Sequence, residues 1–440
     1  MKNGSSGYYN VRDFGAGGKG QALDSPAIQD AIDQCSEDGG GTVLLPAGLY
    51  LAGTIFLKDN VNLHLAAGAT VLGSPNRADY NRDDLFPQNR VFANEHKVTG
   101  AHLILALEAK NVSITGSGII DGNGPAFFGP SPQPGAKFPV PEWRPGQMIY
   151  FVECENVRVE NVELRNPPYW TLFLHGCEDV RIRGLRIENP PETHNGDGID
   201  IDSCRNVVIS DCLISVGDDC ITLRGYNMPL KDPTKICENV AVTNCLLRTP
   251  CNAIRVGVGD GAIRNCVFSN IVVRDSENGI CLIANYTDGT QKGTDIENIR
   301  FSNFVMNTRM PFYIFTGRKS TARIRNIWFS DIQATARKSS FLCGIPGARL
   351  SGIHFRNIDL EISGGQESIA PAEKLPGLCW EWDRGRPAAL YCAHAEELTF
   401  DRVTVKWGAL DGPWRNALLT EHCAGVSQLN STLPAPPSAS

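Results

Sequence analysis

The sequence lacks any long apolar run. Hydrophobic residues make up 42% of its 440 residues, yet no segment approaches the roughly 18 consecutive apolar residues of a membrane-spanning helix. The opening residues 1–7 also lack the apolar stretch of a secretory signal. We therefore expect no membrane partner. We expect a cytoplasmic location if the chain is complete, and a secreted or periplasmic one if a signal has been removed.

The sequence also lacks an excess of positive charge. Its 41 Lys and Arg residues and 48 Asp and Glu residues give a formal net charge of −7. Nucleic-acid-binding domains usually carry a basic stripe, so no nucleic-acid partner is expected. The 15 cysteines include no CxxC pair and no His/Cys cluster with zinc spacing. Most cysteines are therefore expected to be reduced core residues, and no metal or cofactor is expected.

A short pattern repeats along most of the chain. Alternation with a period of two indicates a β-strand, and so short a strand buries its apolar face only when successive copies stack. The pattern predicts an all-β solenoid, a parallel β-helix, whereas a β-propeller would need several strands per blade and a longer period. Each copy opens with Asn or Asp (Gly in one) before alternating apolar residues, at Asn111, Asn156, Asp179, Asn206, Asn239, Asn298, Asn326 and Gly352.

The chain divides into three predicted parts. Residues 1–59 are expected to cap the solenoid, because Pro26 opens a segment with apolar residues on one helical face and a strand follows it. Residues 60–426 are expected to form the β-helix, and residues 427–440 a flexible tail. Within the β-helix, the Gly- and Pro-rich residues 122–146 predict a long loop that forms one wall of a cleft.

Two acidic clusters lie about one coil apart. Asp197, Asp200 and Asp202 fall within N-G-D-G-I-D-I-D, and Asp218 and Asp219 fall within G-D-D-C. Neighbouring coils of a parallel sheet are about 4.8 Å apart, so at least three carboxylates are expected on one small patch. The period of two predicts that Asp200 and Asp202 point outward while Ile201 points inward.

Paired carboxylates suit the hydrolysis of glycosidic bonds. Inverting hydrolysis needs one protonated carboxyl for the leaving oxygen and one carboxylate to activate water, about 6.5–9.5 Å apart. Unequal surroundings can provide both protonation states. The aspartates could instead be turn residues, calcium ligands or a solvated acidic face. The one-coil spacing of the two clusters favours catalysis over each of these.

In these motifs the chain resembles the polygalacturonase-like proteins of glycoside hydrolase family 28. The acidic clusters match the family patterns N-x-D-G-x-D and G-D-D-C. The resemblance extends to N-V-R-D-F-G-A at residues 10–16, G-I-I-D-G-N-G at residues 118–124 and the pair Arg144 and Pro145. It implies a right-handed β-helix and single-displacement, inverting hydrolysis of pectin-type chains, either galacturonide or rhamnogalacturonan-like.

The resemblance also implies roles for single residues. Asp218 corresponds to the general acid, and Asp197 and Asp219 correspond to the pair that activates water. Asn195 and Asp200 correspond to supporting residues at the substrate. The implied partner is a carbohydrate, and the oligomeric state is left open.

Two family motifs are not matched. In place of the histidine of G-H-G stands Cys251 or Asn252, and Cys281 and Ile283 occupy the positions of the two cations of R-I-K. Each lost charge-assisted contact is worth about 1.5–3 kcal/mol. We therefore expect a variant specificity, such as rhamnogalacturonan, another uronide or a neutral sugar.

Other polar and aromatic residues near these motifs are candidates for substrate binding. Arg224 or Arg255 could replace the missing cations, and Asn252 stands where the histidine would be. Aromatic rings stack on sugar faces, although packing is the commoner role of each ring. The aromatic candidates are Trp170, Tyr286 and Tyr313.

Two other functions fit the same fold. A polysaccharide lyase or epimerase abstracts a proton beside a carboxylate, usually with calcium and an Arg, Lys, His or Tyr base, but the cluster here offers aspartates and no adjacent cation. A non-catalytic glycan-binding β-helix would not need carboxylates one coil apart. The sequence favours a glycosidase over both.

Overall fold

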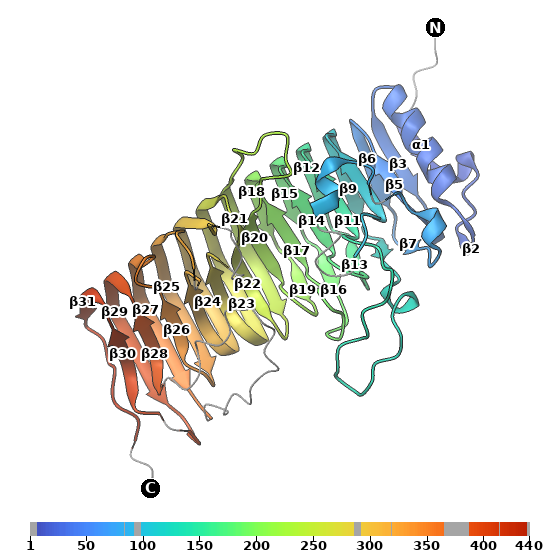
Figure 1. Cartoon of the computed structure of the whole chain (residues 1–440). Coiled ribbons are helices and arrows are strands. Elements are labelled where there is room, and N and C mark those ends of the chain that lie inside the picture. Colours follow the sequence, from blue (N-terminus) through green and yellow to red (C-terminus); the bar gives the residue numbers. More distant parts are fainter. Residues whose placement is uncertain are drawn as a thin grey trace. The chain divides into compact units, whose positions relative to one another are not determined.

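The computed structural model describes residues 7–82, 84–91, 98–285, 292–317, 319–364, 387–412 and 414–437. The chain divides into two compact units, one of residues 1–219 with 228–235 and the other of residues 220–227 with 236–440. Each unit is a succession of short parallel strands joined by turns (Figure 1). Within the described residues, no helix has the length and apolar character to cross a membrane.

The first unit contains one α-helix, four 3-10 helices and the strands β1 to β19. The helices are η1 Val11–Phe14, α1 Ser25–Glu37, η2 Arg77–Asp79, η3 Pro87–Val91 and η4 Gly124–Ala126. The strands are β1 Tyr8–Asn10, β2 Lys19–Leu23, β3 Gly41–Leu45, β4 Gly48–Ala52, β5 Ile55–Leu57, β6 Val61–Leu65, β7 Ala69–Gly73, β8 Ile104–Leu107, β9 Lys110–Gly116, β10 Ile119–Asp121, β11 Ile149–Val152, β12 Glu155–Glu160, β13 Glu163–Arg165, β14 Leu172–His175, β15 Glu178–Arg183, β16 Arg186–Glu188, β17 Ile199–Asp202, β18 Arg205–Ser210 and β19 Leu213–Ser215.

The second unit contains strands β20 to β31. They are β20 Ile221–Gly225, β21 Cys237–Arg248, β22 Asn252–Gly259, β23 Ala262–Ile283, β24 Asp295–Phe315, β25 Ile324–Ala336, β26 Ser340–Cys343, β27 Leu350–Ile362, β28 Ala388–Ala393, β29 Ala395–Trp407, β30 Asn416–Glu421 and β31 Ala424–Leu429.

Three parallel sheets form the walls of the first unit. One runs β8–β11–β14–β17, a second β9–β12–β15–β18 and a third β10–β13–β16–β19. Val112, Val157, Val180 and Val207 stand in register on successive coils of the second sheet, and all four are buried. The stacking of short strands with a two-residue alternation is the predicted parallel β-helix.

Asparagines at the corners explain why the repeat begins with this residue. Asn111, Asn156 and Asn206 have φ angles of 54°, 53° and 56°, in the left-handed region that asparagine tolerates better than most residues. The amide of Asn156 donates to the side-chain oxygen of Asn111 at 2.8 Å, and the amide of Asn111 donates to Asn60 at the same distance. These side-chain hydrogen bonds thus align the corner of each coil with the corner of the next coil.

Phenylalanines fill the interior of the second unit. Phe268, Phe301, Phe329, Phe355 and Phe400 stack in that order, one per coil, with ring centroids 4.9, 5.2, 4.8 and 5.4 Å apart. These distances suit offset stacking. The column lies on the sheet β23–β24–β25–β27–β29, where each phenylalanine takes an inward position.

The predicted capping helix is confirmed as α1, which contacts β3, β5 and β6 (Figure 1). The structure adds detail at both ends of the predicted β-helix. Strand β3 already pairs with β6, so coil stacking starts before residue 60. At the other end β31 includes residues 427–429, and the Trp407 indole donates to the carbonyl of Pro434 at 2.9 Å. The predicted flexible tail is therefore hydrogen-bonded as far as residue 434.

The cysteine prediction holds for one column in the first unit. Cys154, Cys177 and Cys204 are buried thiols, and the backbone N–H of Cys177 donates to the sulfur of Cys204 at 3.2 Å. Burial raises the pKa of the Cys177 thiol far above its ordinary value. The Cys177 thiol therefore stays protonated, and the three buried cysteines act as small apolar side chains.

Candidate active site

The turn before β17 places Asp197 at the end of a coil. The carbonyl of Asp197 accepts hydrogen bonds from the Thr171 backbone N–H at 3.0 Å and from the Thr171 hydroxyl at 2.6 Å. The Asn189 amide donates to the Gly196 carbonyl at 3.0 Å. Asn195 precedes this turn, half-buried, with a φ of 54°. Neighbouring segments therefore hold the backbone of Asp197 firmly, while its side chain keeps 5% exposure.

The turn after β19 places Asp218 beside the Asp197 turn. The Gly217 N–H donates to the Gly196 carbonyl at 3.3 Å, and the Gly198 N–H donates to the Asp219 carbonyl at 2.8 Å. Asp197 and Asp218 thus lie between two backbone hydrogen bonds that join the same pair of turns. This arrangement agrees with the predicted one-coil spacing of the acidic clusters.

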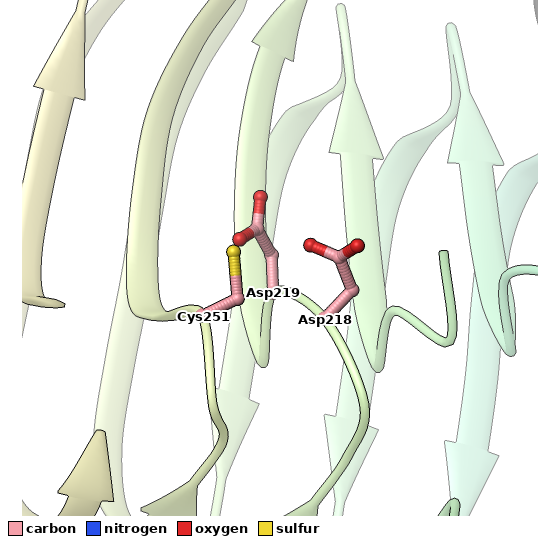
Figure 2. Close-up of side chains that lie close together, drawn as sticks. All are labelled: Asp218, Asp219 and Cys251. Atoms are coloured by element: carbon pink, nitrogen blue, oxygen red, sulfur yellow. The ribbon is translucent and has the colours of Figure 1, made fainter. Parts of the chain in front are cut away.

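Asp218 and Asp219 are half-buried neighbours on their turn. Their carboxylate oxygens lie within 4.8 Å of one another, and Figure 2 shows both side chains projecting from the same side of the turn. Like charges at this distance repel, so the fold holds these two carboxyl groups together at a cost. Hydrolysis of a glycosidic bond by acid and base catalysis requires carboxyl groups held close in this way.

Gly217 is required by the closeness of the turns. A Cβ at this position would lie 2.7 Å from the Pro190 carbonyl oxygen and 2.9 Å from that of Thr193. Both neighbours are backbone atoms of a well-packed turn, so neither could move aside cheaply. The glycine of the G-D-D motif thus allows Asp218 to approach the coil that carries Asp197.

Lys137 is a site residue that the sequence did not reveal. Its ammonium donates to three backbone carbonyls, those of Pro191 at 3.0 Å, Thr193 at 3.1 Å and Gly217 at 2.6 Å. It belongs to the loop of residues 122–146, which was predicted to line the site. A single lysine in a Gly- and Pro-rich loop belongs to no recognisable motif. Its hydrogen-bond partners also lie 54 to 80 residues away in the sequence.

Replacing Lys137 by Met should slow turnover with little effect on folding. The three lost hydrogen bonds free the Gly217 carbonyl, next to Asp218, and small displacements of reacting groups are costly. We expect kcat to fall by about 10- to 100-fold, as measured on the best substrate. Lys231→Met is the matched control, because Lys231 is exposed and pairs with Glu108. Equal kcat values for the two variants would contradict the positioning role.

Arg144 is also buried beside the acidic turns. Its side chain is fully shielded from solvent, and its Nη1 donates to the carbonyls of Pro168 and His194, each at 2.9 Å. Its guanidinium carbon lies 4.9 Å from the centre of the Tyr169 ring. In the sequence, Arg144 was noted only as one of the residues that carry the family resemblance, and no role was predicted for it.

Two predicted substrate contacts in the first unit are closed off from solvent. Asp200 is fully buried and stands in register with Phe173 on β14. Trp170 is 5% exposed and packs between Tyr169, stacked at 5.0 Å, and Phe173. The prediction that Asp200 and Asp202 face solvent is wrong, because both side chains are fully buried. The roles predicted for Asp200 and Trp170 at the substrate stay predictions.

Four predicted binding residues belong to the second unit. Asn252 and Arg255, on β22, are each 2% exposed, whereas Arg224 on β20 is half-buried. The Arg255 Nη1 donates to the sulfur of Cys281 at 3.2 Å, and Asn252 accepts from the Asn278 amide at 2.7 Å. The fourth residue is Tyr313, treated next. Tyr286 lies outside the described residues.

Tyr313 belongs to an apolar cluster, and its predicted contact with sugar is not supported. It is 1% exposed and stacks on Phe341 with ring centroids 5.4 Å apart. Cys281 and Ile283, at the positions of the family's missing cations, belong to the same cluster. Apolar side chains suit these positions because the outer face of this sheet is packed with aromatic rings.

Aspartates on adjacent turns of a parallel β-helix are the arrangement of a polysaccharide-cleaving enzyme. Residues 85–374 match the model of glycosyl hydrolases family 28. The match covers more than half of the chain, so the protein belongs to this family and is a glycosidase. The predictions of family and enzyme class are both confirmed.

Several relatives and solved structures support this assignment. A probable polygalacturonase of Vitis vinifera is 27% identical over 390 residues, or 83% of this chain and 76% of the relative. An exo-poly-alpha-D-galacturonosidase of Dickeya chrysanthemi is 26% identical over 318 residues, 62% of this chain and 51% of its own length. The chain thus spans about half of that relative.

The fold is shared with family 28 enzymes of known structure. An exopolygalacturonase of Thermotoga maritima superposes with a TM-score of 0.66 at 25% identity, covering 81% of this chain and 87% of its own. A family 28 exopolygalacturonase of Yersinia enterocolitica gives a TM-score of 0.71 at 20% identity, covering 96% and 78%. The predicted right-handed parallel β-helix is confirmed.

Proposed function

We propose that this protein hydrolyses pectin-type oligo- or polysaccharides with inversion at the anomeric carbon. The observation that carries the proposal is the pairing of the Asp197 and Asp218 turns on neighbouring coils. The names of its relatives support the substrate class, since they include polygalacturonases and a probable endo-xylogalacturonan hydrolase of Neosartorya fischeri.

The three aspartates divide the reaction between them. Asp218 donates its proton to the glycosidic oxygen as the bond from that oxygen to the anomeric carbon breaks. Asp197 and Asp219 accept a proton from the water that attacks the opposite face of the same carbon. Single displacement by water gives the inverted product. Proton exchange with solvent then restores the protonated Asp218 and the two carboxylates.

The recognition of the sugar differs from the family pattern in the second unit. Arg255 is the cation beside residue 281, and Asn252 occupies the histidine position. We propose that Asn195, which is half-buried on the Asp197 turn of the first unit, provides a polar contact to the substrate. The two cations of the family motif are absent. The sugar whose glycosidic bond is cleaved is therefore a galacturonate, a rhamnogalacturonan unit or a neutral sugar, and activity on all three should be compared.

A panel of pectic oligosaccharides tests the proposal. We expect new reducing ends, no unsaturated product that absorbs in the ultraviolet, and a first-formed product whose anomeric configuration, followed by NMR, is opposite to that of the substrate. An absorbing product that requires calcium would replace hydrolysis by lyase chemistry. Retention of configuration would contradict the single-displacement mechanism. If no oligosaccharide in the panel gave a product, the result would favour a non-catalytic glycan-binding protein.

A further inference from the structure

Arg144 is a charged side chain that the proposed reaction does not yet use. It is fully buried, whereas most arginines of the described chain are at least partly exposed. A buried guanidinium is costly unless hydrogen bonds and negative charge compensate for the lost water. The groups that surround Arg144 therefore indicate the role of its positive charge.

The hydrogen bonds of Arg144 tie together the two segments that hold Asp197. Pro168 stands three residues before Thr171, which binds the Asp197 carbonyl through its N–H and its hydroxyl. His194 stands three residues before Asp197 itself. One guanidinium nitrogen thus joins both segments through their carbonyl oxygens, and the Tyr169 ring packs against its face.

The charges of Arg144 and Asp197 also interact. Burial lowers the pKa of Arg144 to about 10, while its electrostatic interactions with Tyr169 and Asp197 act in the opposite direction. A pKa of about 10 leaves the guanidinium positively charged at neutral pH. The site therefore contains one permanent, buried positive charge that attracts Asp197.

We propose that Arg144 is a positioning residue that fixes Asp197 and keeps it ionised, so that Asp197 can take the proton from the attacking water. The inference rests on the proposed function and extends it to a residue outside the two acidic motifs. Arg144 does not touch substrate in this role.

The other charged groups around Asp197 make such a cation necessary. The Asp219 carboxylate on the neighbouring turn opposes a negative charge on Asp197. His194 lies on the same turn, and Lys137 reaches this region only through backbone carbonyls of residues 191, 193 and 217. Tyr169 packs on Arg144. Among these described groups, Arg144 is the buried cation that offsets the neighbouring carboxylate.

The pH dependence of kcat/KM in Arg144→Met tests the inference. The acid limb of this profile reports the essential base of the free enzyme. Asp197 must be ionised to act, so removing the cation should move the acid limb to higher pH, by about one unit or more. Arg144→Lys, which keeps a charge, should move it less. Arg186→Met is the matched control, since Arg186 is exposed and pairs with Glu188, and its acid limb should stay at the wild-type position.

The outcomes separate this inference from the proposed function. If the wild type shows no turnover on the panel, the proposed function fails. If the wild type is active and Arg144→Met keeps the wild-type acid limb, the positioning role fails alone. A purely structural role would lower kcat at every pH without moving that limb.

If Arg144→Met does not fold, the thermal stability of Asp197→Asn answers the question without assaying activity. The attraction between Asp197 and Arg144 stabilises the folded protein while the carboxylate is ionised, and it is lost as the pH falls and the carboxylate is protonated. Asp197→Asn should therefore melt below the wild type at pH 7, and the gap should close as the pH falls through the pKa of Asp197 in the folded protein. A variant as stable as the wild type at pH 7 would overturn the inference.

Discussion

Asp218→Asn is expected to abolish most turnover while leaving the fold intact. The amide has nearly the same shape as the carboxyl but cannot protonate the leaving oxygen. General acid catalysis is worth about 10²- to 10⁴-fold, so kcat on a pectic oligosaccharide should fall by that factor. The measurement is the initial rate of reducing-end formation, with circular dichroism to confirm the β-helix.

Two comparisons make this result specific to the acid role. Asp211→Asn is the control, because Asp211 is exposed, pairs with Arg183 at 3.1 Å and has a φ of 59° that asparagine tolerates. It should retain wild-type kcat. An aryl glycoside, whose leaving group needs little protonation, should restore much of the rate of Asp218→Asn but not that of Asp197→Asn. A full loss on the aryl substrate would take Asp218 out of the acid role.

Phe301→Ala should cause the largest loss of stability among simple core substitutions in the second unit. Phe301 is fully buried between Phe268 and Phe329 in the phenylalanine column. Deleting a buried phenylalanine ring typically costs about 3–5 kcal/mol, because apolar contacts are lost and a cavity remains. Urea unfolding followed by circular dichroism measures the decrease in the free energy of unfolding.

The control for Phe301 lies on the same strand. Val305 on β24 is 52% exposed, so Val305→Ala should change the free energy of unfolding by no more than about 0.5 kcal/mol. Phe301→Leu, which refills much of the space, should lie between the two. A small effect of Phe301→Ala would show that the column does not hold neighbouring coils together.

The sequence was sufficient for the fold class because the repeat carries its own geometry. Asn156 and Asn206 mark corners, and the alternating apolar residues after them mark the inward face of one sheet. These are local signals that recur on every coil. The ends were harder to place, since the first coil at β3 lacks the asparagine pattern, and the strand β31 differs in composition from the strands before it.

The acidic turns were also predictable, since coil length alone brings residues 197 and 218 to neighbouring turns. Arg144 and Lys137 were not, because their partners lie 24 to 80 residues away and carry no pattern. The burial of Tyr313 was not predictable either, for a different reason. Strand alternation tells which face a side chain occupies, and the outer face was assumed to meet solvent, whereas an apolar cluster covers that face of the sheet in the second unit.

The corner asparagines have a consequence for how such an enzyme changes over evolutionary time. Since the corner asparagine of one coil donates its amide to the asparagine of the coil before it, as Asn156 does to Asn111, extra chain can be inserted between strands without altering the strand register. The segment 228–235 shows the result: it follows β20, yet Lys235 donates to the carbonyl of Gly176 at 2.7 Å in the first unit. Lineages can thus rebuild the surroundings of the cleaved bond by insertion while the reacting carboxyl groups keep their places.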